Sequence, residues 1–197
     1  MIVRRFSVAV LAATLALAAC KGDPPPPPAP PGPDQDSLQA YRDSVAAAEA
    51  AAREEAARRA AAAAAEREAQ AAMQAARATL EEAVLFDYDM SDIRGNMETL
   101  MRRKAAILRA SPQVQLRIEG HADERGSTEY NMALGNRRAA AVRDFLTGFG
   151  LSESRFEIVS FGEDRPRSQG SGEAAWAQNR RGEFRITAGA GAINPAN

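Results

Sequence analysis

Residues 36–83 contain no glycine or proline, and this constrains the chain more than any other feature of the sequence. The segment is dominated by Ala, Glu, Arg and Gln, which have high intrinsic helix propensity. Glu49, Glu54 and Glu55 each precede an arginine by four residues, the order that favours an exposed helix. We therefore predict one long alanine-rich helix over residues 36–83.

This predicted helix has no apolar stripe over most of its length. From Ala46 to Ala72 there is no Leu, Ile, Val, Phe or Met, so the repeat that stabilises a coiled coil is missing. We interpret the segment as a solvated spacer, which would reach about 70 Å at 1.5 Å per residue. An alanine-packed coiled coil is the alternative, and it is favoured by larger apolar residues near the helix ends, namely Leu38, Val45, Met73 and Leu80.

The first twenty residues have the pattern of a bacterial secretion signal. Arg4 and Arg5 precede an apolar run at residues 6–19, which is too short to span a bilayer core of about 30 Å. We expect residues 1–19 to be removed as a signal peptide. Cys20 follows Leu-Ala-Ala and is the only cysteine, so no intramolecular disulfide can form, and we expect this residue to be lipidated. A spare thiol in a cleaved leader is the alternative.

Residues 20–35 form the expected anchor and linker. The stretch 24–33 contains eight prolines, which favour a stiff polyproline II spacer of about 30 Å. The lipobox before Cys20 resembles those of bacterial lipoproteins, and this resemblance implies a chain anchored in the outer membrane and facing the periplasm.

Residues 84–188 are the only part of the chain that can build a sizeable core. Val114, Leu116 and Ile118 alternate with polar residues, which predicts a half-buried strand ending at Gly120. We predict an α+β fold with two main helices on one face of a small mixed four-stranded sheet. The predicted helices cover about 91–110, capped by Ser91, and 128–149; the predicted strands cover 84–86, 114–119, 156–161 and 183–187. We expect 189–197 to be a flexible tail.

An acid and an arginine stand fifteen residues apart around the end of the second predicted strand. Asp123 follows the strand, and Arg138 lies in the row of the next helix that faces the sheet. A carboxylate can bind an ammonium group and a guanidinium can bind a carboxylate through two hydrogen bonds, so the pair suits a zwitterionic ligand. The alternative is an internal Asp123–Arg138 salt bridge that only fixes the loop.

Three stretches of this region closely resemble the OmpA-like domain family, in particular the peptidoglycan-associated lipoproteins. They are FDYD at 86–89, IEGHADERGSTEYNMALGNRRA at 118–139 and NRRGEF at 179–184. The resemblance implies that Asp123 and Arg138 meet the zwitterionic end of meso-diaminopimelate in the stem peptide of peptidoglycan. It further implies pocket roles for Asp89 and Asn131, an apolar wall at Leu134, and a periplasmic partner, the TolB propeller of the Tol system.

The expected function is therefore noncovalent tethering of the outer membrane to the cell wall. We expect Asp123→Ala or Arg138→Ala to abolish wall binding while leaving the thermal transition unchanged. A protein scaffold of the envelope that uses the same domain without wall binding is the main alternative. A murein hydrolase is a weaker one, because the domain offers only Asp123 facing a cation rather than a catalytic carboxylate pair.

Other ligand classes fit the sequence poorly. Asp87, Asp89, Ser91 and Glu98 match positions of a calcium loop, but Asp92 stands where that loop requires glycine. The sequence has a single histidine, His121, and its only thiol is assigned to lipid, so we predict no zinc site. We also expect no cofactor and no catalytic residue. Because 25 basic residues face 26 acidic ones, nucleic acid is not an expected partner.

Overall fold

The structure is a computed structural model that describes residue 32 and residues 34–196. The chain divides into two compact units, one ending at Arg53 and one covering Glu54–Asn197. The expected signal peptide at 1–19, the expected lipidation site Cys20 and nearly all of the proline tract lie outside the described residues. Among the described helices, none combines the length and the apolar character that a bilayer crossing requires.

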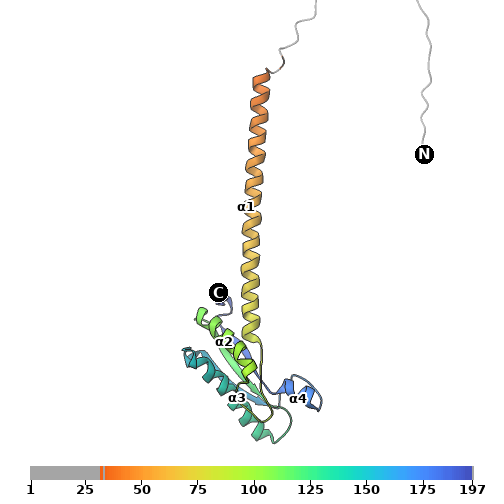
Figure 1. The fold of residues 1–197 in the computed structure, drawn as a ribbon, viewed down its shortest axis with the longest axis vertical. Helices are drawn as coiled ribbons and strands as arrows, with labels where there is room; N and C mark the ends of the chain where they lie inside the picture. Colours follow the sequence, from red (N-terminus) through yellow and green to blue (C-terminus); the bar gives the residue numbers. More distant parts are fainter. Residues whose placement is uncertain (1–31, 33, 197) are drawn as a thin grey trace, which may run out of the picture. The chain divides into compact units, whose positions relative to one another are not determined.

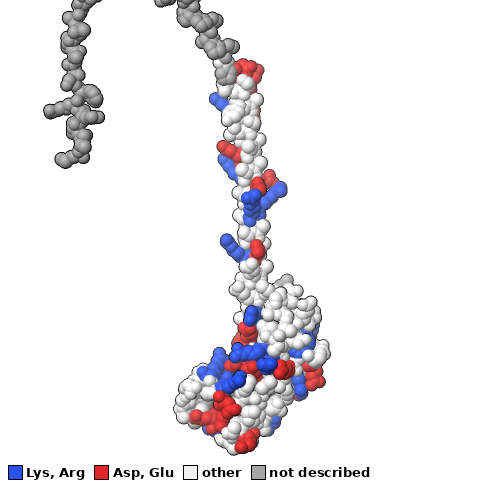
Figure 2. Space-filling view, turned by 180° about the vertical axis from the view of Figure 1, so that it is seen from behind, with Lys and Arg blue, Asp and Glu red and all other residues white. Residues whose placement is uncertain are grey.

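The alanine-rich segment forms one helix, α1 (Gln35–Glu81), as predicted. Asp34 begins it by accepting a hydrogen bond from the backbone N–H of Ser37 at 2.7 Å. The helix is exposed up to residue 71, and acidic and basic side chains lie beside each other along it (Figure 2). Glu54 accepts from Arg58 at 2.6 Å, one of the predicted pairs four residues apart. Local propensity and local pairing account for this part of α1.

The last turns of α1 belong to the core of the second unit. Ala76 and Leu80 are buried there, and Met73 is partly buried against the same core. Lys104 donates to the carbonyls of Thr79 and Leu80 at 2.7 Å each and to that of Glu82 at 2.6 Å, so its ammonium caps the end of the helix. Met73 and Leu80, which favoured the coiled-coil alternative, are therefore used inside the domain.

The core is a mixed four-stranded sheet covered by helices, which confirms the predicted α+β class. The strand order is β1-β4-β2-β3, with β2 and β3 parallel and the other neighbours antiparallel. Leu116 and Ile118 point from β2 into a core that also contains Leu108 and Val142 from the helices, which lie side by side on the sheet (Figure 1). The elements are β1 (Val84–Leu85), α2 (Gly95–Ala110), β2 (Gln115–His121), α3 (Thr128–Gly148), β3 (Phe156–Gly162), α4 (Glu173–Asn179) and β4 (Arg181–Ala188).

Two glycines set the position of α3 on the sheet. A Cβ added to Gly120 at the end of β2 would lie 1.8 Å from the carbonyl oxygen of Gly135 in α3. A Cβ added to Gly135 would lie 2.3 Å from the Ser160 hydroxyl on β3. Helix and strand backbones therefore meet directly, which brings the first turns of α3 against the end of β2.

The structure corrects the predicted start of the first domain helix. The helix α2 begins at Gly95, and its N-cap, Arg94, makes no side-chain capping bond, whereas we predicted a cap at Ser91. The carbonyls of Asp87 and Met90 instead accept hydrogen bonds from Arg138. This long-range contact holds residues 87–90 in a turn outside the helix and overrides the local capping signal.

Two further corrections concern the C-terminal part. The short helix α4 was not among the predicted helices. The tail at 189–197 was expected to be flexible, but Ile193 is buried in the core and the Asn194 N–H donates to Ser111 at 2.8 Å. The expectation overlooked Ile193 as a core residue because it stands alone among small residues.

Candidate functional site

A cavity of about 210 Å³ lies where the end of β2 meets the start of α3. The loop after β1 completes its wall. All five residues predicted for the binding site line it, together with four others that the prediction did not include. The lining residues are Tyr88, Asp89, Asp123, Arg125, Gly126, Tyr130, Asn131, Leu134 and Arg138.

Arg138 is fully buried at this cavity, as its place in the sheet-facing row of α3 predicted. Its Nε donates to the Met90 carbonyl at 2.8 Å, Nη1 to the His121 carbonyl at 2.7 Å and Nη2 to the Asp87 carbonyl at 3.0 Å. Burial lowers its pKa to about 10, so the guanidinium remains charged at neutral pH. Because a guanidinium has five N–H donors, two remain for a ligand.

Asp123 is buried as well and is held by two arginines. Arg125 binds its carboxylate through Nε at 3.0 Å and Nη2 at 2.6 Å, and Arg180 adds a bond from Nη1 at 3.3 Å. Burial by itself would raise the pKa of Asp123, but the hydrogen bonds from Arg125 and Arg180 outweigh this and hold the pKa below its ordinary value. The group is therefore a carboxylate at neutral pH.

The pairing of the charges contradicts the alternative of an internal Asp123–Arg138 salt bridge. Asp123 and Arg138 line one cavity, but the direct salt bridge between them does not form, because Asp123 binds Arg125 and Arg180 while Arg138 binds main-chain carbonyls. Both groups are thus already bound to other parts of the domain. The sequence does signal the Arg125 contact, since that residue follows Asp123 by two positions and its backbone N–H also donates to the carboxylate at 3.1 Å.

Arg125 is stacked between two aromatic rings at the border of the cavity. Its guanidinium lies 3.9 Å from the centre of the Tyr88 ring and 4.1 Å from that of Trp176. The Trp176 Nε1 donates to Glu124 at 3.0 Å, which fixes the indole. The short helix α4 thus carries Trp176 to the loop that holds Arg125.

The remaining predicted residues line the same cavity with partners of their own. Asn131, in the first turn of α3, donates to Glu163 at 2.5 Å and to the Arg125 carbonyl at 3.2 Å. Asp89 accepts a hydrogen bond from the Tyr130 hydroxyl, and its backbone is left-handed with φ of 59°. Leu134 is nearly fully buried and forms an apolar part of the wall.

Comparison with known proteins supports this view of the fold. The sequence profile of the OmpA family matches residues 85–180. The peptidoglycan-associated lipoproteins of Brucella melitensis and Pseudomonas aeruginosa are each 46% identical, over 98 and 100 residues; the matches cover 50% and 51% of this chain and 58% and 59% of those proteins. The chain thus spans less than two thirds of the length of the curated relatives it matches.

A solved structure also matches the domain. The crystal structure of the peptidoglycan-associated lipoprotein from Burkholderia pseudomallei is 40% identical with a TM-score of 0.52, and the match covers 53% of this chain and 89% of that one. On sequence and fold together, the chain belongs to the OmpA family, with a domain of the peptidoglycan-associated lipoprotein type.

Proposed function

We propose that the domain binds the zwitterionic end of meso-diaminopimelate in peptidoglycan stem peptides, without covalent attachment and without catalysis. The observation that carries the proposal is the placement of an anionic Asp123 and a cationic Arg138 on the wall of one small cavity. The names of the similar lipoproteins, which describe association with peptidoglycan, support the same ligand class.

Arg138 would bind the carboxylate of the ligand. Its three bonds to the carbonyls of Met90, His121 and Asp87 fix the guanidinium plane before any ligand arrives. The two remaining N–H groups can donate to a carboxylate, and their burial strengthens the interaction because water does not compete. Preorganisation of this kind lowers the entropic cost of binding.

Asp123 would bind the ammonium group, and this requires a change at Arg125. The Asp123 carboxylate already accepts from the backbone and two nitrogens of Arg125 and from Arg180, which together use its four acceptor positions. The Arg125 side chain is 28% exposed, whereas that of Arg180 is 4% exposed. Arg125 is therefore the partner that can withdraw, and we propose that the ligand ammonium takes its place.

The rest of the chain would hold this domain at a distance from the membrane. Lipid on Cys20 would anchor the domain in the outer membrane. The proline tract and α1 would set the distance from the membrane, since the exposed part of α1 builds no core. The protein would then tether the outer membrane to the cell wall as part of the Tol envelope system, with TolB as a partner. A protein scaffold that uses the same domain without wall contact is the second candidate.

Pull-down on purified sacculi separates the candidates. Wall tethering predicts that the chain is retained without digestion, a scaffold predicts no retention, and a hydrolase predicts soluble muropeptides. We expect Asp123→Asn to lower retention strongly while Asp92→Asn, at an exposed position in the loop before α2, leaves it unchanged. Circular dichroism on each variant checks that the domain is folded; equal retention of the two folded variants would contradict the proposal.

A further inference from the structure

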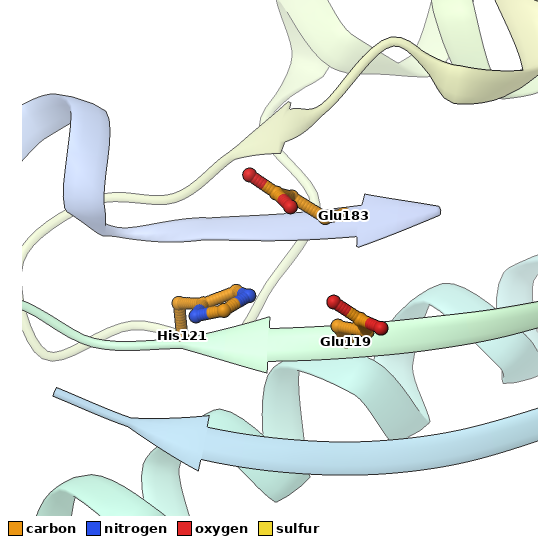
Figure 3. Close-up of side chains that lie close together, drawn as sticks. All are labelled: Glu119, His121 and Glu183. Atoms are coloured by element: carbon orange, nitrogen blue, oxygen red, sulfur yellow. The ribbon is translucent and has the colours of Figure 1, made fainter. Parts of the chain in front are cut away.

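The polar face of the sheet carries a second cluster of functional side chains, separate from the cavity. Glu119 and Glu183 are direct neighbours across β2 and β4, and His121 follows two residues later on the same face of β2. Figure 3 shows the three side chains together on these two strands. One donor atom from each lies within 4.8 Å of the other two.

His121 is the unexplained member of this cluster. Its side chain is 1% exposed, and neither ring nitrogen has a hydrogen-bond partner among the described residues. Buried polar groups in folded proteins nearly always have a partner, so an orphaned imidazole indicates a missing ion or water. A ring nitrogen within 4.8 Å of two carboxylate oxygens can act as a metal ligand together with them.

We propose that Glu119, His121 and Glu183 bind a divalent transition-metal ion of the zinc class. Imidazole nitrogen and carboxylate oxygen are both ligands that zinc accepts, and the imidazole disfavours magnesium and calcium. Bonds of about 2.0–2.2 Å place tetrahedral zinc ligands about 3.4 Å apart. Small side-chain rotations therefore bring the three donors to ligand distance, and water would take the fourth position.

The surrounding charges allow this ion and limit its affinity. The buried Arg181 donates to Oε1 of Glu183 at 2.7 Å and orients the carboxylate, while Oε2, the oxygen that the metal would take, accepts a hydrogen bond from Arg185 at 3.4 Å. Arg185 lies 3.8 Å from Glu119 and 3.4 Å from Glu183, but its side chain is 65% exposed and can turn into solvent. Burial and the nearby Arg181 also lower the pKa of His121 to about 4, so its nitrogen lone pair is available at neutral pH.

The sequence does not reveal the Glu119–His121–Glu183 site, because its single histidine has no second histidine and no free cysteine to suggest zinc binding. Glu119 and Glu183 are far apart in the chain, and only the register of β2 with β4 brings them beside His121. The site is also distinct from the wall-binding cavity: its ligands are on the polar sheet face, while the His121 carbonyl binds Arg138. Failure of one proposal therefore leaves the other testable.

The test is titration of zinc chloride into the full chain, purified in detergent with a tag that contains no histidine. His121 is the only histidine, so its imidazole nitrogen NMR signals report on this site alone. We expect one zinc ion per chain, a clear shift of those signals, and at least about tenfold weaker binding for Glu119→Gln and for Glu183→Gln. Glu157→Gln, which removes a paired carboxylate from neighbouring β3, should bind like the unaltered chain.

Two results would overturn the site. Unshifted His121 signals at saturating zinc would mean that any bound metal sits elsewhere, as an adventitious ion only. Equal zinc affinity in the two glutamate variants and in Glu157→Gln would lead to the same conclusion. If a glutamate variant fails to fold, the His121 signals of the unaltered chain still decide the question.

Discussion

The exposed part of α1 and the folded domain use charged residues in opposite ways. In the exposed part of α1, three acid–arginine pairs join residues one turn apart, and both partners remain largely exposed, as for Glu54 and Arg58. In the domain, Arg138 and Lys104 are fully buried and bind carbonyls contributed by distant segments. The exposed pairs therefore support a helix locally, whereas the buried cations hold separate segments together.

The largest expected effect is the loss of Arg138. We expected from the sequence that Arg138→Ala would leave the thermal transition unchanged, but its burial and its three carbonyl bonds change that expectation. Arg138→Ala should lower the free energy of unfolding by about 4 kcal/mol, since buried carbonyls lose their donors. Calorimetry would show the midpoint falling by roughly 15 °C or more. Arg137→Ala, at the exposed neighbouring position, is the matched control. An equal shift in both variants would show that the buried arginine contributes no more to stability than the exposed one.

The contact between α3 and β2 should be the next most sensitive. Gly120→Ala places a methyl group 1.8 Å from the Gly135 carbonyl oxygen. The nearest atoms all belong to the Gly135 backbone, so α3 must shift. We expect a loss of about 3 kcal/mol in unfolding free energy. Gly148→Ala, in the last turn of α3 with open space around it, should be neutral or slightly stabilising. Urea denaturation of the pair measures both effects, and a stable Gly120→Ala domain would show that the helix position is adjustable.

Lys104 tests whether the domain supports the end of α1. Lys104→Met keeps the apolar stem but removes the ammonium from the carbonyls of Thr79, Leu80 and Glu82. The expected cost is about 2 kcal/mol of unfolding free energy, and amide hydrogen exchange should become faster in the last turn of α1. Arg103→Met, at an exposed neighbouring position, should change neither; unchanged exchange in Lys104→Met would mean that the helix end is held by Ala76 and Leu80 alone.

The smallest effect is expected in the exposed part of α1. Glu54→Gln removes the partner of Arg58, and both side chains lie mostly in solvent. Such pairs contribute little to stability, so the unfolding midpoint of the domain should not change measurably. A clear decrease would indicate that this stretch of α1 is packed, as the coiled-coil alternative requires, and sedimentation of the same variant would then reveal an altered oligomer.

The difference between local pairs and long-range buried contacts also explains which features the sequence could predict. The long helix, the strand around Ile118 and the end of α3 shortly before Gly150 follow from local propensity and periodicity, and the structure has all three. Five of the residues that line the cavity were predicted, Asp123 and Arg138 from their positions and the other three from the family resemblance. The partners of Asp123 and Arg138 could not be predicted, because Arg180 and the Met90 carbonyl reach the site only through tertiary packing. The same is true of Trp176, whose short helix has no distinctive pattern.

Calorimetric titration with two stem peptides tests directly whether Asp123 and Arg138 bind the zwitterionic end of meso-diaminopimelate. One peptide ends in meso-diaminopimelate, and the other carries lysine, which has the same ammonium group but lacks the distal carboxylate. If Arg138 binds that carboxylate while Asp123 binds the ammonium, the diaminopimelate peptide should bind at least about tenfold more tightly. Equal affinity for the two peptides, or no binding of either by the folded chain, would contradict the account.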